Sequence, residues 1–209
     1  MRLRTESARA LLAVALLLAA SIANAAAQQT APQAPAGLTA PAAPPAPPMR
    51  LTSTAYKDST PIPIKFTCSA QPSAVSPALQ WSDVPRETVS FVLIFHDLEP
   101  RPRRGFEDNL HWMLWNIPAS VTQLSEGVPA NAELPDGTRQ LISQQAGNNV
   151  GYRGPCPPQN VPLPHHYVFD LFALDVKLDL PATATRADVQ KAIDGHIAGH
   201  AVLAGLVTR

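Results

Sequence analysis

Charge is scarce in this chain, and neither sign dominates. Only 15% of the 209 residues are charged, against about 25% in an average soluble domain. Sixteen basic side chains balance sixteen acidic ones, and like charges never form a block of five or six. A protein that binds nucleic acid normally gathers a basic excess on one face. The composition therefore argues against nucleic acid as a partner, and it excludes a charged tail.

Familiar catalytic and metal-binding signatures are also missing. The sequence has no Gly-x-Ser-x-Gly nucleophile elbow, no phosphate-binding P-loop and no zinc-type cysteine pairing. His196 and His200 have helical spacing for a metal pair, but Gly195 and Gly199 disfavour a helix there. We therefore predict a non-enzymatic protein with neither a metal nor a cofactor. A weak hydrolase that activates water with an Asp–His pair is the enzymatic alternative.

The N-terminal segment has the pattern of a secretory signal peptide, which we predict over residues 1–27. An apolar, uncharged run over residues 10–20 follows three arginines, and small residues come after it at Ala23, Ala25 and Ala27. The run is shorter than the roughly 20 apolar residues of a spanning helix. We thus expect cleavage rather than a retained anchor, no stable membrane span afterwards, and a periplasmic or secreted protein.

The next stretch, residues 28–48, is predicted to be a disordered linker. It consists almost entirely of Ala, Pro and Gln, and seven of the 23 prolines of the chain precede residue 49. Such a composition buries too little surface to offset the loss of chain entropy on folding. A single folded domain is expected over residues 49–209.

This domain is predicted to be mainly β. Continuous runs of apolar and β-forming residues predict strands over 90–97, 110–117, 166–175 and 201–208, the first buried on both faces. Pro–Gly punctuation between the runs favours turns over helices. One helix is expected near the C-terminus, where Thr185 and Asp188 form a capping-box pattern and Gly195 marks the end.

Several ordered motifs resemble the phosphatidylethanolamine-binding protein family in its bacterial Raf-kinase-inhibitor-like branch. They lie in the order Ser76–Trp81, Val84–Pro85, Asp97–Pro102, His111–Trp112, Gly151–Pro158, His165–Phe169, Ala173–Asp175 and Gly199–Ala204. Each piece alone is weak, whereas their common order over residues 49–209 is specific. The resemblance implies two packed β-sheets with one or two short peripheral helices.

The resemblance also implies a small pocket for phosphoryl or other anionic head groups. Carried over residue by residue, the pocket would use Asp97, Glu99, His111, Tyr152, the backbone of Gly154 and Pro155, His165 and Tyr167. Imidazole and phenol groups donate hydrogen bonds to phosphate oxygens, and a nearby carboxylate orients an imidazole. Glu99 stands where the family usually has a second Asp. Because cations are few in these motifs, weak binding is expected.

Two further expectations concern the cysteines and a protein partner. The even cysteine count in an oxidising compartment favours a disulfide between Cys68 and Cys156, while two buried free thiols are the alternative. Members of the family that this chain resembles are similar to kinase or protease inhibitors. The resemblance therefore implies an alternative function, an interaction module that inhibits a protease or kinase. Its contact surface would be the basic segment Arg101–Arg104.

Overall fold

The computed structural model describes residues 47–99, 108–143 and 149–209. The main sheet has six strands in the order β2-β11-β10-β4-β5-β7, antiparallel except between β2 and β11. Their bounds are β2 Thr60–Pro61, β4 Ser90–Asp97, β5 Asn109–Pro118, β7 Arg139–Gln140, β10 His165–Leu174 and β11 Ile197–Val207. A second sheet contains β1 Arg50–Thr52, β3 Leu79–Ser82 and β6 Gln123–Leu124.

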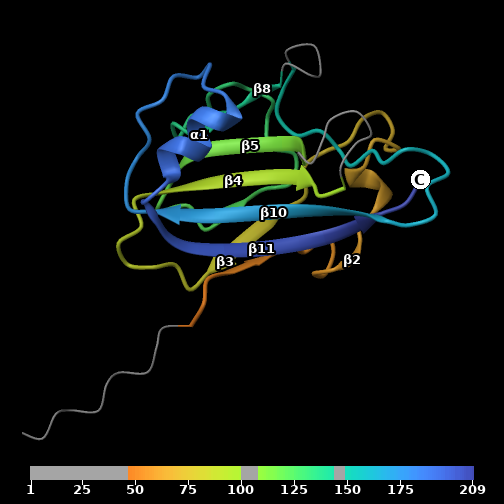
Figure 1. Cartoon of the computed structure of the whole chain (residues 1–209), viewed down its shortest axis with the longest axis horizontal. Coiled ribbons are helices and arrows are strands. Elements are labelled where there is room, and N and C mark those ends of the chain that lie inside the picture. The colour runs from red at the N-terminus through yellow and green to blue at the C-terminus, as the bar shows by residue number, and fades with distance from the viewer. Residues whose placement is uncertain (1–46, 100–107, 144–148) are drawn as a thin grey trace, which may run out of the picture. The chain divides into compact units, whose positions relative to one another are not determined.

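Three short elements and one α-helix complete the described part of the chain. β8 (Ile142–Ser143) and β9 (Asn149–Val150) pair with each other, and η1 (Ile64–Phe66) is a single turn of 3-10 helix. The helix α1 (Arg186–Ile193) lies over β4 and β5, while β3 lies behind the main sheet (Figure 1). The architecture is therefore mainly β with two sheets and one short α-helix, as predicted.

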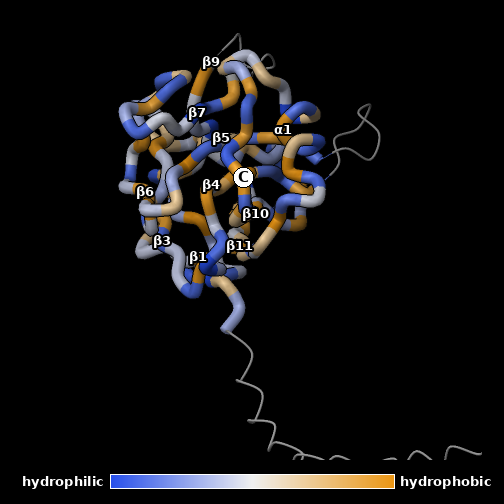
Figure 2. Tube along the Cα trace, turned by 90° about the vertical axis from the view of Figure 1, so that its left-hand side faces the viewer, coloured by the Kyte–Doolittle hydropathy of each residue, from blue (hydrophilic) through white to orange (hydrophobic). Residues whose placement is uncertain are grey.

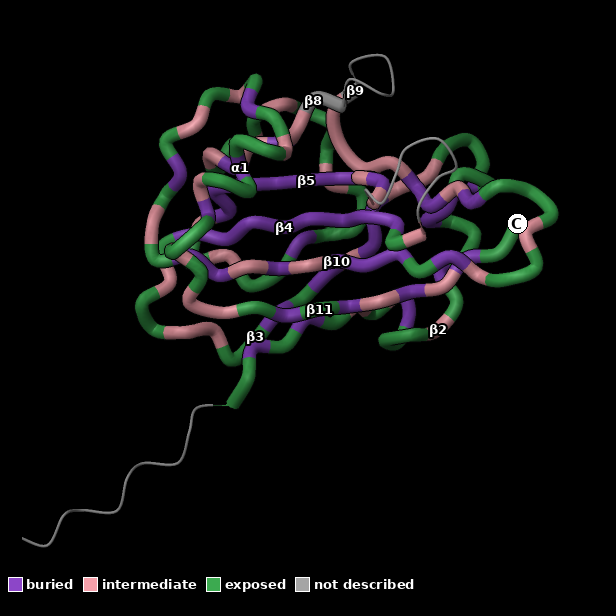
Figure 3. The backbone as a smooth tube through the Cα atoms, viewed as in Figure 1, coloured by how far each residue is buried: buried purple, intermediate pink, exposed green. Residues whose placement is uncertain are grey.

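The long strands follow the apolar runs, with shifted ends. β4 begins and ends where predicted, and all eight of its residues are buried (Figure 3). β5 and β10 each differ from the prediction by one residue at either end. The last strand was predicted to begin at Ala201, but β11 begins at Ile197. Its first residues pair with the end of β10, and this backbone pairing overrides the low strand propensity of Gly199.

Both faces of β4 are covered by hydrophobic side chains. Phe91, Leu93 and Phe95 belong to a core cluster that includes residues of the small sheet. Val92 and Ile94 point the other way, into a cluster that includes Val189 and Ile193 of α1. Successive side chains of a strand point to opposite faces, and Figure 2 shows hydrophobic residues along the chain trace around β4. A central strand covered on both sides is thus continuously apolar.

The capping box predicted for α1 is confirmed. The Thr185 side chain accepts a hydrogen bond from the Asp188 backbone N–H, and the Asp188 carboxylate accepts from the Thr185 backbone. Two otherwise unsatisfied backbone donors of the first helical turn are thereby paired. After the helix, Gly195 adopts φ +78°, a left-handed conformation that glycine reaches without steric cost.

A charged network ties α1 to the main sheet. The imidazole of His96 lies between two carboxylates, with Nδ1 bonded to Asp108 and Nε2 2.7 Å from Asp170. Arg186, the first residue of α1, pairs with Asp108, and His200 pairs with Asp170 at 2.7 Å. An imidazole that donates from both nitrogens carries a positive charge. This buried cation therefore joins β4 to β10 and to the chain just before β5.

The pKa values of this network shift in opposite directions. Burial alone would lower the pKa of His96, but hydrogen bonds to Asp170 and Asp108 outweigh it and raise the pKa. Burial alone would raise the pKa of Asp170 and of Asp108, but their hydrogen bonds to His96, His200 and Arg186 lower both. The contribution of protonated His96 to the free energy of unfolding is complete below about pH 6.5. It is lost as the pH rises through the raised pKa of His96. The carboxylates contribute above about pH 3.9 and lose that contribution as the pH falls through their lowered pKa values.

We predict that His96→Asn destabilises the protein most strongly at mildly acidic pH. Removing one partner of a buried ion pair costs about 3–5 kcal/mol, because the remaining charges stay buried. The free energy of unfolding, measured by urea denaturation at pH 5.5 and pH 9, should fall more at pH 5.5. His196→Asn is the matched control, since His196 forms an exposed pair with Asp175 worth about 0–1 kcal/mol. Equal losses for the two variants at pH 5.5 would contradict this role of His96.

Candidate functional site

At one end of the main sheet, strand β4 ends and its two neighbours, β5 and β10, begin. Tyr167 of β10 lies opposite Asp97 of β4, and Asp97 lies opposite Asn109 of β5. Directly opposite residues of an antiparallel sheet share a face. His165 and His111 stand two residues away from this row, on β10 and β5. In Figure 1 this is the right-hand end of the sheet, near the C-terminus of the chain.

Asp97, Glu99 and His165 form one hydrogen-bonded cluster at this end. His165 Nδ1 lies 3.1 and 3.0 Å from the two carboxylate oxygens of Asp97. The Glu99 backbone N–H donates to Asp97 over 3.1 Å. The Glu99 carboxylate also contacts His166, at 2.6 Å from the backbone nitrogen and 2.7 Å from Nδ1. His165 is buried, while His166 is exposed, so the side chains of these adjacent histidines point to opposite faces of β10.

The two carboxyl groups of this cluster have different pKa shifts. Burial is the largest influence on Asp97 and raises its pKa, although hydrogen bonds from His165 and Tyr167 oppose it. Burial alone would raise the pKa of Glu99 as well, but hydrogen bonds from His166 lower it. A hydrogen bond between the two carboxyl groups raises the pKa of Asp97 and lowers that of Glu99. Asp97 is therefore the weaker acid of the two.

Tyr167 separates this cluster from a second group of predicted residues. Its ring stacks on His165 with centroids 6.4 Å apart, and it meets His111 edge-on at 5.2 Å. The Tyr167 hydroxyl accepts a hydrogen bond from the backbone N–H of Cys156 over 3.2 Å. The phenol thus bridges the carboxylate cluster, the histidine of β5 and the loop before β10.

The second group lines a pocket of about 750 Å³. His111, Tyr152, Arg153, Gly154 and Cys156 form one wall, and Cys68 and residues 70–74 form the other. Arg153 is the sole lining residue with a formal charge among the residues that the structure describes. Sequence reasoning had not placed Arg153 in the site. Its position inside the Gly151–Pro158 motif, beside Tyr152, was the available signal.

A chain of hydrogen bonds fixes the His111 ring. The Arg153 guanidinium donates to the Asn109 side-chain oxygen over 3.3 Å and to the Leu110 carbonyl over 3.0 Å. This orients the Asn109 amide so that its NH₂ donates to His111 Nε2 over 2.8 Å. His111 Nδ1 then donates to the Arg153 carbonyl over 2.9 Å, so both ring nitrogens are engaged. Arg153 carries the formal positive charge among the described residues that line the pocket.

Tyr152 and Gly154 are held by the opposite wall of the pocket. The Tyr152 hydroxyl donates to the Phe66 carbonyl over 2.8 Å, and burial raises its pKa far above the usual value. A Cβ on Gly154 would stand 2.8 Å from the Thr67 carbonyl carbon and from the Ala74 side chain. The absence of a Cβ at Gly154 therefore allows the neighbouring chain segment to approach closely.

A disulfide joins the two walls. Cys68 and Cys156 are bonded, with Cα atoms 5.3 Å apart and a sequence separation of 88 residues. The Cys68 backbone N–H also donates to the Pro155 carbonyl over 3.0 Å. Pro155 lines a separate pocket of about 440 Å³ near Arg209 and is not among the described residues that line the pocket containing His111.

The predicted residues thus divide into three sets. Asp97, Glu99 and His165 form the carboxylate cluster, and Tyr167 connects it to His111, Tyr152 and Gly154 at the larger pocket. Pro155 lies outside both. The basic segment over residues 101–104 falls outside the described residues, as do the predicted signal peptide and most of the linker.

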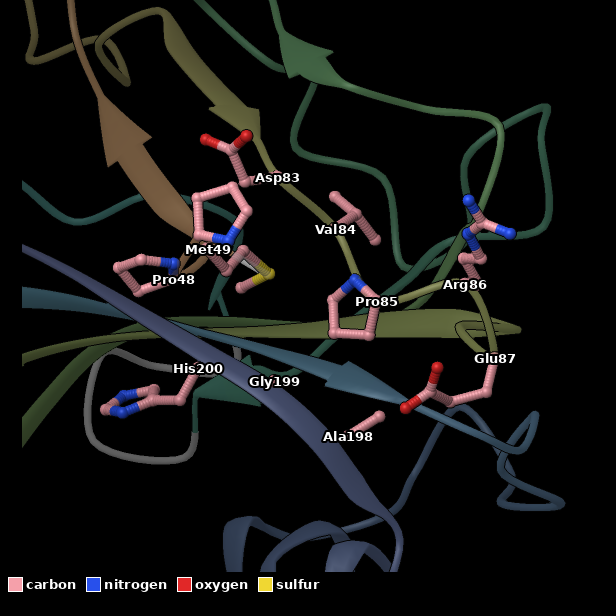
Figure 4. Close-up of a pocket in the computed structure, with 11 residues that line it drawn as sticks. Pro48, Met49, Asp83, Val84, Pro85, Arg86, Glu87, Ala198, Gly199 and His200 are labelled. Carbon is pink, nitrogen blue, oxygen red and sulfur yellow. The ribbon is translucent and has the colours of Figure 1, made fainter. Parts of the chain in front are cut away.

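Another pocket of about 710 Å³ contains none of the predicted anion-site residues. It lies toward the other end of β11, between the β3–β4 connection and the chain before β1 (Figure 4). Pro85 faces Gly199 across it, and a Cβ on Gly199 would come within 2.8 Å of the Pro85 ring. His200 belongs to its lining, whereas His196 pairs separately with Asp175. The two histidines thus have different carboxylate partners, Asp175 for His196 and Asp170 for His200.

Among the described residues, no helix has the length and apolar character needed to cross a membrane. The sequence model described as phosphatidylethanolamine-binding protein matches residues 52–208. A UPF0098 protein of Methanothermobacter thermautotrophicus is 41% identical over 161 residues, which cover 77% of this chain and 99% of that protein. A Mycobacterium tuberculosis protein named as a candidate lipoprotein, LppC, is 34% identical over 182 residues, covering 85% and 83% of the two chains.

Two crystal structures share the fold. One is described as a phosphatidylethanolamine-binding protein homologue from Chlamydia trachomatis, with 36% identity, a TM-score of 0.66, and coverage of 78% of this chain and 98% of that one. The other is YbcL of E. coli, with 27% identity, a TM-score of 0.66, and coverage of 78% and 99%.

We predict that the disulfide is a major source of stability for the pocket. A loop of this length gives about 4–5 kcal/mol in the chain-entropy estimate, and real bridges give about 2–5 kcal/mol. The double variant Cys68→Ser/Cys156→Ser should lose that amount in urea denaturation. Wild-type protein with reductant should reproduce the loss, and the double variant should not respond to reductant. An unchanged midpoint in both experiments would contradict the prediction.

Proposed function

Because the chain belongs to the phosphatidylethanolamine-binding protein family, we propose that it is a binding protein for a small anion with a phosphoryl or similar head group. The ligand occupies the pocket lined by His111, Tyr152 and Arg153, where it is bound and not transformed. The observation that carries the proposal is the Arg153 guanidinium, a fixed positive charge in a lining that is otherwise formally uncharged among the described residues.

The pocket chemistry suits a weakly held anion. A volume of about 750 Å³ admits a phosphate with a small substituent, since ligand sites commonly span about 300–1,000 Å³. Guanidinium groups match phosphate oxygens in geometry and charge. Arg153 is already hydrogen-bonded to Asn109 and Leu110, so its orientation is set before a ligand arrives. With one cation, affinity in the micromolar to millimolar range is expected, about −4 to −8 kcal/mol.

We also propose that the protein acts outside the cytoplasm, in the periplasm or the medium. Support comes from the Arg-rich start, the short apolar run over residues 10–20, the disulfide of Cys68 and Cys156, and the named lipoprotein candidate among the relatives. Intact mass measurement of the protein from a bacterial periplasmic fraction should give a chain that begins between residues 25 and 28. A cytoplasmic chain with Met1 retained would contradict export.

We predict that inorganic phosphate and phosphoethanolamine bind at Arg153. In a titration followed by nuclear magnetic resonance, the His111 and Tyr152 signals should shift at millimolar ligand. Arg153→Gln should weaken binding about tenfold or more, because a charged hydrogen bond contributes about 1.5–3 kcal/mol.

The matched control is Arg50→Gln, which removes the same charge from an exposed arginine paired with Asp83 on the small sheet. If both variants weaken binding equally, the effect is general electrostatics and the pocket assignment fails. If the His111 and Tyr152 signals of the wild type stay still at millimolar ligand, the proposed function itself fails.

A further inference from the structure

The cluster of Asp97, Glu99 and His165 has the composition of a metal site. Each side chain offers one ligand atom, and these atoms all lie within 4.8 Å of one another. Asp97 and His165 are buried, and the Glu99 carboxylate is partly exposed. The ligands are therefore positioned by packed strand ends, and one side of the cluster stays accessible.

The separations fit the coordination sphere of a small divalent ion. Ligands that lie about 2.0–2.1 Å from a tetrahedral zinc ion lie about 3.3 Å from each other. His165 Nδ1 lies 3.0 Å from Asp97 Oδ2 and 3.9 Å from Glu99 Oε2, so the observed distances bracket that value. All three ligand atoms lie within 4.8 Å of one another, so side-chain adjustment alone could bring them to ligand positions.

Something must offset the repulsion between two carboxyl groups held this close. A divalent ion bound between them would neutralise both carboxylates. It would also take the Nδ1 lone pair of His165, whose proton would then lie on Nε2.

Surrounding hydrogen bonds already orient two of the three ligands. His166 holds the Glu99 carboxylate through its backbone N–H and its Nδ1, and Tyr167 bonds to Asp97. Partners of this kind fix the direction of ligating carboxylates in metal sites. One imidazole with two carboxylates suits zinc and chemically similar ions better than a soft thiolate-seeking ion.

We propose that Asp97, Glu99 and His165 bind one divalent ion of the zinc class, with at least one coordination position open toward solvent. No local motif signals this site, because Asp97 and His165 are 68 residues apart and meet only across the β4–β10 pairing. The metal site rests on this geometry alone. Its use as a second anchor for the phosphoryl group rests on the proposed function.

The test is a zinc titration of the full-length chain, prepared without a histidine tag and freed of metal with a chelator. Isothermal calorimetry should show one equivalent of Zn²⁺, with affinity rising as the pH rises. Co²⁺ should give visible absorption bands in the same site. Asp97→Asn and His165→Gln should each lower Zn²⁺ affinity about 100-fold or more, since even outer partners of metal ligands are worth about 10–100-fold.

Two further variants keep the result interpretable. Glu99→Gln alters a partly exposed ligand and should lower affinity about tenfold or more, even if a buried variant fails to fold. His196→Gln, in an exposed His–Asp pair of 2.9 Å, should leave zinc affinity unchanged. No zinc binding by the wild type, or equal binding by Glu99→Gln, His165→Gln and His196→Gln, would overturn the proposal.

Phosphate titrations with zinc and with chelator separate the two proposals. Phosphate binding that strengthens with zinc supports both the metal site and its role as an anchor. Phosphate binding in chelator, without zinc binding, supports the proposed function and overturns the metal site. Zinc bound through Asp97 and His165, without phosphate binding under either condition, supports the metal site and overturns the proposed function.

Discussion

The register of β4 against its two neighbours is the constraint on which the site depends. β4 is buried on both faces, so a slip by one residue would still leave apolar side chains in apolar surroundings. The polar end of the strand makes a slip costly. His96 and Asp97 point to opposite faces, and each has fitted partners: Asp108 and Asp170 for the imidazole, His165 for the carboxylate. A shift would leave both groups buried without these partners, which costs several kcal/mol.

Stability and recognition are therefore joined at one end of the sheet. The network around His96 holds β10 and the chain just before β5 beside β4. The opposite face of the same strand ends carries Asp97, His111 and Tyr167. The disulfide then fixes the loop before β10 to the N-terminal wall. Side chains on rigid strand ends would lose little conformational freedom when a ligand binds. The entropic cost of binding would therefore be small even where each individual contact is weak.

The sequence predicted what depends on local pattern. The β4 run, the Thr185–Asp188 capping box and the two-sheet class followed from apolar continuity, cap chemistry and family resemblance. It did not predict what depends on distant pairing. Nothing local shows that Arg153 turns back to Asn109, or that His96 lies between two carboxylates from other segments. The early start of β11 was missed for the same reason, since its first residues become a strand only by pairing with β10.

The positions of the charged groups would decide how tightly the proposed anion binds. Arg153 lies at the larger pocket, and the carboxyl groups of Asp97 and Glu99 lie on the other side of the Tyr167 ring. Two ionised carboxylates there would repel an anion held by Arg153. Under the two proposals, a divalent ion held by the cluster would remove that repulsion. Occupancy of the carboxylate cluster would then set the affinity of the neighbouring pocket, although the two share no side chain.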